Sequence, residues 1–331
     1  MPQKLPVTPR HAHFDRREML TLMGLFGLHG LFGQALGAAP QTAGTLVIHE
    51  KWARVDRLGE GLWSVVSDPL SGNFQTVCNG GIISGTERTV VFDAFMMPEG
   101  GRWVAEVTRK LTGRWPTDVV ISHYHGDHVN GLAGFRGAGG ESPRLWMTEA
   151  TRRRVIETDG QRENPDAVRL EMLEAAETLP TDRVTRLDLG GRIASLRPHQ
   201  GHTDSDVTLE IEEPRTLFWG DLLWFGMFPN FRDARPSALA EAVRTLLSEP
   251  RTHHVSGHGP VVAVEGVQLY RDLLDHFEGA ARESFDKGLS PEEAAKAYAL
   301  PERAADWHLF QPTYFETAMG AWHRELGGAK S

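Results

Sequence analysis

The sequence predicts an α/β fold in which two packed mixed β-sheets are flanked by helices and followed by a helical C-terminal tail. Short β-branched runs, separated by turn residues, alternate with amphipathic helical patterns from residue 45 onward. These runs form two strand-rich halves on either side of a charged, helical region at 148–178. No repeat, low-complexity tract or Pro/Ser-rich linker divides residues 45–331, so we expect one domain with the tail packed on it.

The first half is expected to contain three strands before its first helix, at 62–68, 74–85 and 88–95. The helix at 100–113 follows, because its apolar side chains fall on one face. The continuous apolar run "TDVVIS" at 117–122 predicts a strand that is covered on both sides.

The second half is expected to contain strands at 192–199, 207–213, 215–221 and 253–257. A helix at 236–248 lies between the last two of these strands, and the chain is expected to be mostly helical from Val264 onward. Within that tail, Ser290 and Glu293 form a capping-box pattern that predicts the start of a helix.

The first 37 residues are typical of an export signal, because a basic pair precedes a short apolar run that ends in small residues. Arg16 and Arg17 in "DRREML" resemble a twin-arginine signal, although Asp15 and Met19 depart from the usual pattern. We therefore expect a signal peptide at 1–37, the export machinery as a partner, and a periplasmic or secreted protein. The alternative is that this segment is not cleaved and anchors the protein, and only in that case is contact with a membrane expected. The apolar run is short and contains several glycines, which argues against a membrane-spanning anchor.

Charge and cysteine content narrow the class of protein. A net charge of −9 would repel a phosphate backbone, so a nucleic-acid partner is not expected. Cys78 is the only cysteine, so no intramolecular disulfide can form even in an oxidising compartment. This suits a protein that folds before export, with Cys78 as a small buried hydrophobic residue.

Three histidines and an aspartate fall within six positions of "VVISHYHGDHVNG", residues 119–131: His123, His125, Asp127 and His128. If the preceding strand continues, His123 and His125 face the same way. Gly126 would then let the chain turn, so that the next two polar side chains approach from another direction. Imidazole and carboxylate groups together suit zinc, and also manganese or iron. The alternative is a polar surface turn.

Further polar residues stand beside glycine at three later strand ends. His202 in "HQGHTDSD", Asp221 in "LFWGDLL" and His258 in "HHVSGHGP" each follow a glycine directly. An unpaired carboxylate at Asp221 would be costly at the end of an apolar strand. Four such groups in one chain favour a metal site over a surface turn.

The combined pattern resembles the metallo-β-lactamase superfamily, through H-x-H-x-D-H at 123–128, G-H-T-D at 201–204, G-D at 220–221 and G-H-G at 257–259. The likeness spans residues 60–262 and implies an αββα sandwich with its metal site along one edge of the two sheets. We accordingly expect a metallo-β-lactamase-like domain at 45–262 and a helical C-terminal extension at 263–331. Asp93, which ends the run "RTVVFD", matches the aspartate that supports the metal ligands from behind.

Carried over residue by residue, the resemblance implies two ligand sets that share Asp221. The sets are His123, His125 and His202, and then Asp127, His128 and His258. They imply two divalent ions, zinc being expected with iron or manganese as alternatives. The resemblance also implies that a metal-bound hydroxide attacks an ester, thioester, lactone or lactam bond of a small molecule. Asp127 could also orient or deprotonate the water, so it is the expected catalytic side chain.

Other residues near these motifs fall outside the pattern. His199, His253 and His254 are expected either to lie in strands or to support the ligands from behind, and Tyr124 is expected to be structural. The segment "LLWFGMFPNFRD" after Asp221 is rich in aromatic residues, among them Trp224, Phe225 and Phe228. These either form the wall of a pocket for an apolar acyl or ring group or pack under the C-terminal helices.

Departures from individual branches of the superfamily narrow the function. One group of β-lactamases has cysteine at the position of Asp221 and another lacks the bridging aspartate, so a dedicated β-lactamase is less expected. No set of glutathione-binding residues comparable to that of glyoxalase II is evident after residue 262. We therefore expect an exported metal-dependent hydrolase. Two alternatives stay open: a mononuclear iron redox enzyme similar to sulfur dioxygenases, and a non-catalytic exported accessory protein.

Overall fold

The computed structural model describes residues 44–328, which fall within a single compact unit of the chain. Its first sheet has eight strands, paired in the order in which they occur in the sequence. They are β1 (Thr45–His49), β2 (Ala53–Gly59), β3 (Leu62–Ser67), β4 (Gly80–Ser84), β5 (Thr89–Phe92), β6 (Asp118–Val120), β7 (Arg144–Thr148) and β8 (Glu177–Leu179). Strands β1 to β5 pair antiparallel, whereas β5 to β8 pair in parallel.

The second sheet has five strands in the order β13-β12-β11-β10-β9. They are β9 (Thr185–Asp188), β10 (Ile193–His199), β11 (Asp206–Ile211), β12 (Thr216–Phe218) and β13 (His253–Val255). Strands β9 to β12 pair antiparallel, and β13 pairs with β12 in parallel. Both sheets are therefore mixed.

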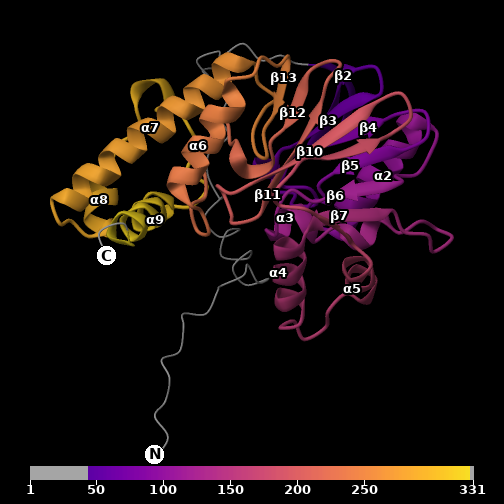
Figure 1. Cartoon of the computed structure of the whole chain (residues 1–331), viewed down its shortest axis with the longest axis horizontal. Coiled ribbons are helices and arrows are strands. Elements are labelled where there is room, and N and C mark those ends of the chain that lie inside the picture. The colour runs from indigo at the N-terminus through magenta and orange to yellow at the C-terminus, as the bar shows by residue number, and fades with distance from the viewer. Residues whose placement is uncertain (1–43, 329–331) are drawn as a thin grey trace, which may run out of the picture. The chain divides into compact units, whose positions relative to one another are not determined.

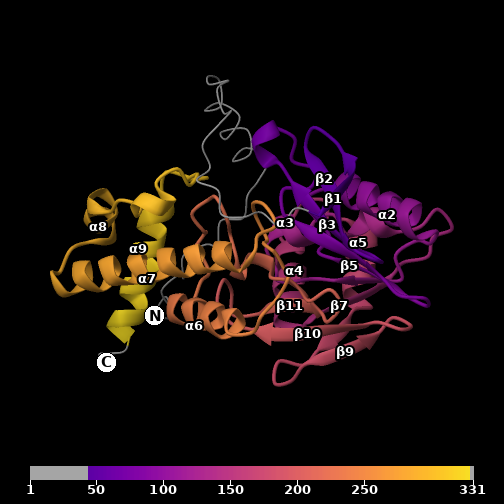
Figure 2. The same ribbon diagram turned by 90° about the horizontal axis from the view of Figure 1, so that it is seen from above.

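Helices flank the two sheets, and α6 to α9 lie together beside them (Figure 1). The α-helices are α2 (Pro98–Thr112), α3 (Gly126–Val129), α4 (Glu149–Asp159), α5 (Ala167–Glu174), α6 (Pro236–Leu247), α7 (Val264–Asp286), α8 (Pro291–Ala297) and α9 (Tyr314–Gly328). Short 3-10 helices are η1 (Pro69–Ser71), η2 (Leu132–Phe135), η3 (Gly220–Leu222) and η4 (Glu302–Ala304). Figure 2 shows β1, β2, β3 and β5 of the first sheet, in indigo to purple, in a different layer from β9 and β10 of the second.

The two sheets pack face to face through apolar side chains from both. Phe92 of β5 and Phe218 of β12 are buried there with their ring centroids 5.9 Å apart. A second core fills the space between the first sheet and α2, where Val91 and Val104 are fully buried. A third core lies under α6, α7 and α9. Each sheet is thus covered by the other sheet on one face and by helices on the other, which is an αββα sandwich.

The predicted fold class, two packed mixed sheets flanked by helices with a helical C-terminal tail, is confirmed by this arrangement. The capping box of α8 also forms as predicted. The Ser290 hydroxyl accepts the backbone N–H of Glu293, whose carboxylate accepts the backbone N–H of Ser290.

Several strands differ from the sequence-based expectation. The strand expected at 74–85 is wrong in its first half, because only β4 is extended and residues 74–79 form a loop. There, the side-chain amide of Asn79 donates to the carbonyls of Ser256 and Gly259, so this loop holds the segment around His258. Strands β1, β2, β7, β8 and β9 were not expected. Of these, β1, β8 and β9 are sheet edges, where no continuous apolar run is needed.

The signal peptide predicted at 1–37 lies outside the described residues. Between residues 44 and 328, no helix combines the length and the apolar character needed to cross a membrane.

Candidate metal centre

The polar motifs follow strands that end at one edge of the sandwich. His123 and His125 follow β6, Asp221 lies in η3 shortly after β12, and His258 follows β13. Strand β6 runs parallel to β5, and β13 runs parallel to β12, so the segments after each pair leave the same end of their sheet. His202 joins them from the loop between β10 and β11. The site is therefore assembled from both sheets.

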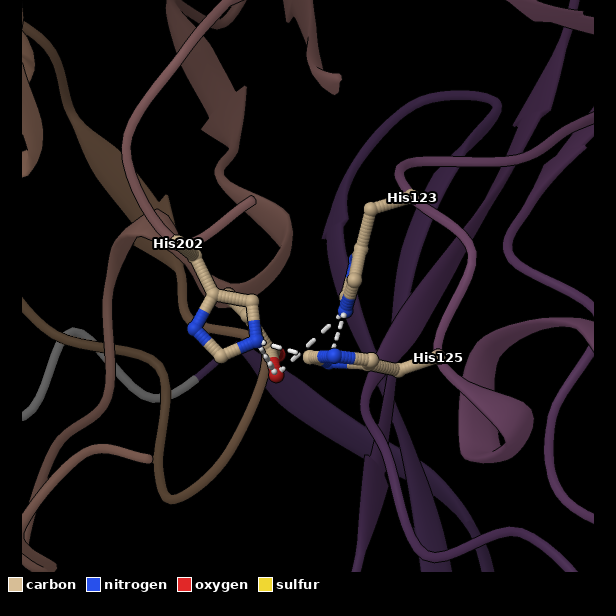
Figure 3. Close-up of side chains that lie close together, drawn as sticks. His123, His125 and His202 are labelled. Carbon is tan, nitrogen blue, oxygen red and sulfur yellow. Dashed lines mark hydrogen bonds and ion pairs between the residues drawn. The ribbon is translucent and has the colours of Figure 1, made fainter. Parts of the chain in front are cut away.

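Three histidine rings point toward one another in the first group (Figure 3). The Nε2 atoms of His123 and His202 lie 3.1 and 2.9 Å from Nδ1 of His125. Asp221 completes this group, with its Oδ2 3.2 Å from Nε2 of His202 and 3.7 Å from Nε2 of His123. Three imidazole nitrogens and one carboxylate oxygen thus converge on one point.

The second group contains Asp127, His128 and His258. Oδ2 of Asp127 lies 3.2 Å from Nε2 of His258 and 3.5 Å from Nε2 of His128. The other oxygen of Asp221, Oδ1, lies 3.1 Å from Nε2 of His128 and 3.4 Å from Nε2 of His258. Asp221 therefore directs one oxygen to each group and lies between them.

Buried polar groups orient the histidines from behind. Nδ1 of His128 lies 2.8 Å from Oδ2 of Asp93, and the backbone N–H of Ser122 donates to Oδ1 of Asp93. A proton donated from Nδ1 to this carboxylate leaves Nε2, which faces Asp221, as the ring nitrogen that can bind a metal. Asp93 has a φ of 66°, which is unusual for a residue with a side chain. Asp93 thus lies directly behind the ring of His128, and its role as a support for a metal ligand stays a prediction.

Two glycines explain why the motifs contain G-D and G-H-G. Gly220, before Asp221, has a φ of 55°, a left-handed conformation that favours glycine. A Cβ atom on Gly257 would lie 2.1 Å from Oδ1 of Asp221 and 2.6 Å from the carbonyl oxygen of Gly220. The segment that carries His258 can pass this close to Asp221 only because Gly257 has no side chain.

The charges of the site are strongly coupled. Burial lowers the pKa of His202 to about 3 and the pKa of His123 well below its usual range, so both rings are neutral. Burial alone would raise the pKa of Asp221, but His128 and His258 hold it well below its ordinary value. Burial opposes the charged form of His258, yet Asp221 and Asp127 raise its pKa to about 9. The site therefore holds ionised carboxylates together with neutral rings at His123 and His202, and with rings at His128 and His258 whose raised pKa values favour the charged form.

The donor atoms fit divalent metal ions. Oδ1 of Asp221 and the Nε2 atoms of His128 and His258 are buried and find no aligned hydrogen-bond partner within residues 44–328. Unpaired polar atoms of this kind are costly in the interior, and a cation would satisfy carboxylate and imidazole lone pairs together. Both groups consist of imidazole and carboxylate donors, which suit zinc, manganese or iron.

The other histidines of the sequence pattern lie outside these groups. His254 is fully buried in β13, where its Nδ1 accepts the indole N–H of Trp219 at 3.1 Å. His199 lies in β10 with its Nε2 3.0 Å from the hydroxyl of Thr208. Tyr124 packs beside the ring of His125, 5.2 Å between centroids. His253 is half-buried in β13.

The expected pocket aromatics divide into two kinds. Trp224 borders the site, since its ring centroid lies 4.1 Å from that of His258 and 6.2 Å from that of His202. Phe225 packs against Trp307, and Phe228 is buried in the core under the C-terminal helices. Packing under the C-terminal helices, one of the two alternatives left open by the sequence, is therefore observed for Phe228, whereas a pocket wall formed by Trp224 stays a prediction.

Two details of the site differ from the sequence-based expectation. Strand β6 ends at Val120, so His123 and His125 lie in a loop rather than on a continued strand. Gly126 does not form an open turn but begins the helical turn α3, and the structure gives it no left-handed φ. Successive helical positions point in different directions, which is how Asp127 and His128 reach the second group.

Sequence reasoning missed three contacts. Ser122 Oγ lies 2.9 Å from Nδ1 of His123, and Cys78 lies with Asp93 and His128 in a third buried group. Burial raises the pKa of Cys78 to about 12, so it stays a thiol as expected of a buried residue. Asp233 contacts His125 from a loop 108 positions away in the sequence. Only Ser122 is adjacent to a motif residue and had a local signal.

A family profile described as "Metallo-beta-lactamase superfamily" matches residues 74–287. The chain belongs to this superfamily, which is made up mostly of hydrolytic enzymes. A search of curated proteins found no match.

Solved structures of low identity share the fold. Metallo beta lactamases from Erythrobacter litoralis and Hirschia baltica are 18% and 17% identical to this chain, with TM-scores of 0.53 and 0.54. The alignments cover 70% and 67% of this chain and 99% and 97% of theirs. A stereoselective inverting sec-alkylsulfatase from Pseudomonas sp. is 16% identical, with a TM-score of 0.62 over 86% of this chain and 50% of the sulfatase. At these identities the likeness shows the fold alone.

Proposed function

We propose that the protein is a dinuclear zinc-dependent hydrolase of a small-molecule ester, thioester, lactone or lactam bond. One observation carries the proposal: Asp221 directs one oxygen to each of two complete groups of ligand-type atoms. Membership of a superfamily made up mostly of hydrolytic enzymes supports the reaction class. A mononuclear redox enzyme would need only one of the two groups, so the presence of both favours the dinuclear hydrolase.

When bound, two divalent ions supply the Lewis acidity and the activation of water that hydrolysis near neutral pH requires. The chain contributes orientation through Asp127, whose side chain is 22% exposed against 2% for Asp221. Burial would raise the pKa of Asp127, but His128 and His258 lower it to about 2, so it is an ionised acceptor at neutral pH. Asp127 would accept a hydrogen bond from the attacking water and fix its orientation, which makes it the proposed catalytic side chain.

The apolar wall of the substrate pocket is proposed to be the indole of Trp224. Its ring lies against His258 of the second group and, at 6.5 Å between centroids, faces Tyr314 at the start of α9. Phe225 and Phe228 would support this wall from behind, since they pack on Trp307 and Phe277. An apolar acyl or ring group next to the reacting bond fits this surface.

The protein is further proposed to act in the periplasm or outside the cell. The support is the basic pair and short apolar run of residues 1–37, which are typical of a twin-arginine signal.

Metal stoichiometry together with a substrate panel tests the function. The protein should be purified without a histidine tag or chelator, analysed by elemental mass spectrometry, and assayed with esters, thioesters, lactones, lactams and a secondary alkyl sulfate. The sulfate is included because of the sec-alkylsulfatase among the structural neighbours. Two zinc ions per chain with turnover of one class would support the proposal. One iron per chain with oxygen consumption would replace it with a redox enzyme, and a metal-loaded protein inert toward the whole panel would favour an accessory role.

A further inference from the structure

A carboxylate outside both ligand groups contacts one of their histidines from behind. His125 presents Nδ1 to the first group, whereas His123 and His202 present Nε2. The remaining nitrogen of His125, Nε2, lies 2.9 Å from Oδ2 of Asp233. The two side chains are 18% and 25% exposed, so most of this contact is shielded from solvent.

This contact determines which ring nitrogen of His125 carries the proton. A neutral imidazole has one N–H and one lone pair, and only the lone pair binds a metal. An aspartate at neutral pH is ionised and accepts hydrogen bonds without donating them. The proton of His125 therefore lies on Nε2, where it is donated to Asp233, and Nδ1 keeps the lone pair that faces the other two histidines.

The segment that carries Asp233 is held on both sides of it. Phe231, two residues earlier, is 1% exposed, and its ring stacks on those of Phe228 and Phe277. The backbone N–H of Arg235, two residues later, donates to the carbonyl oxygen of Gly201 at 2.8 Å, next to His202. Asp233 is thus preorganised against His125 by packing on one side and a backbone hydrogen bond on the other.

We propose that Asp233 is a positioning residue that fixes the Nε2–H tautomer and the ring orientation of His125, and that it thereby raises the metal affinity of the three-histidine group. The inference rests on metal binding by this group, which is part of the proposed function. Carboxylates that hold metal-binding histidines in this way act on affinity without touching the metal. The second group has its own carboxylate behind it, Asp93 on His128, so the effect of Asp233 is confined to the first group.

The experiment compares Asp233→Ala and Asp233→Asn with the wild-type protein and a control variant, Asp272→Ala. Asp272 is a partly exposed carboxylate paired with Arg271 on α7, outside both ligand groups. Competition with a chromophoric chelator gives the dissociation constant of zinc at each group, and cobalt absorption spectra report the ligand geometry. Asp233→Ala should weaken zinc binding at one group by about 10–100-fold and change the cobalt spectrum. Asp233→Asn keeps an oxygen that accepts the Nε2 proton and should recover much of the affinity, whereas Asp272→Ala should match the wild type.

A second readout uses the metal-free protein. Nitrogen-15 NMR of the imidazoles distinguishes Nδ1–H from Nε2–H, so the wild-type spectrum should show His125 as the Nε2–H tautomer. Asp233→Ala should give a mixture of the two forms. A purely structural role for Asp233 would leave this tautomer signal unchanged.

The outcomes separate this inference from the proposed function. If Asp233→Ala keeps the zinc affinities, the cobalt spectrum and the tautomer of the wild type, the inference is wrong. If the wild-type protein itself binds neither zinc nor cobalt, the proposed function fails, and the tautomer signal still decides whether Asp233 sets the proton position. Should Asp233→Ala not fold, Asp233→Leu, which fills the space but cannot accept a hydrogen bond, takes its place with the same expected results.

Discussion

Replacing Asp221 by alanine should deprive both ligand groups of metal. In the structure, Oδ2 of Asp221 lies 3.2 and 3.7 Å from the ring nitrogens of His202 and His123. Its Oδ1 lies 3.1 and 3.4 Å from those of His128 and His258. The substitution therefore removes one oxygen donor from each group at once, together with the single negative charge that the two groups share.

The size of the effect follows from this double role. Removing a residue that only supports a ligand from behind costs about 10–100-fold in metal affinity. Removing a shared ligand should exceed that range, so we expect at least about 100-fold at each group, or ~2.8 kcal/mol per ion. Turnover should fall at least in proportion, because hydrolysis needs both ions.

Three measurements check this prediction: bound metal by elemental mass spectrometry after dialysis, zinc affinity by chelator competition, and the rise in Tm on adding zinc. Asp221→Asn is the matched variant, since it keeps the volume but loses the charge, and it should also lose most of the metal. An Asp221→Ala protein that retained two ions and the wild-type rate would refute the assignment of Asp221 as the shared ligand.

Three further substitutions test other parts of the structure. His254→Ala should leave the metal content unchanged. It should lower the free energy of unfolding by about 1–3 kcal/mol, because it leaves the buried indole N–H of Trp219 without its acceptor. If the variant bound one metal ion fewer per chain than the wild type, His254 would be a ligand. Burial also lowers the pKa of His254 to about 4, so its imidazole binds a proton more readily in the unfolded chain than in the folded one. The free energy of unfolding should therefore fall by about 3 kcal/mol as the pH drops from 6.5 to 4, at 1.36 kcal/mol per pH unit. Acid denaturation curves should show a smaller loss of stability in His254→Ala. Gly257→Ala would place a Cβ atom 2.1 Å from Oδ1 of Asp221 and should weaken metal binding. The control variant Gly279→Ala has open space around the new Cβ atom and should bind zinc as the wild type does. Equal zinc affinities of the two variants would show that the close approach at Gly257 is unimportant. Trp224→Ala should leave the metal content unchanged and should raise KM more for substrates with large apolar acyl groups than for acetyl esters. An equal change in KM for both kinds of substrate would show that Trp224 does not contact the acyl group.

The ligand-type residues could be predicted from the sequence because each stands in a short local pattern. Asp221 and His258 follow glycines whose role is local, namely a left-handed φ at Gly220 and a close approach at Gly257. Strands β3, β5, β10 and β11 could be predicted for a similar reason, since each is a run of mostly β-branched and apolar residues.

Contacts between distant segments could not be predicted in this way. Asp233 reaches His125 only because Phe231 is buried and Arg235 is tied to Gly201, and none of these contacts leaves a local pattern. The edge strand β1 was missed because most of its side chains are exposed, so no alternation of apolar and polar residues marks it. Strand β2 was missed because arginine and aspartate interrupt its apolar residues.

The ligand-type atoms of the first group come from both halves of the sandwich: His123 and His125 follow a strand of the first sheet, while His202 and Asp221 belong to the second. An ion bound there would cross-link segments that lie about 80 to 100 positions apart and would have no comparable site in the unfolded chain. Free zinc at about 100 times its dissociation constant would then add ~2.7 kcal/mol to the free energy of unfolding for each independent site. Separation of the two sheets would have to break this cross-link, so zinc should slow unfolding, and a chelator should open the interface between the sheets before it opens the cores under the helices.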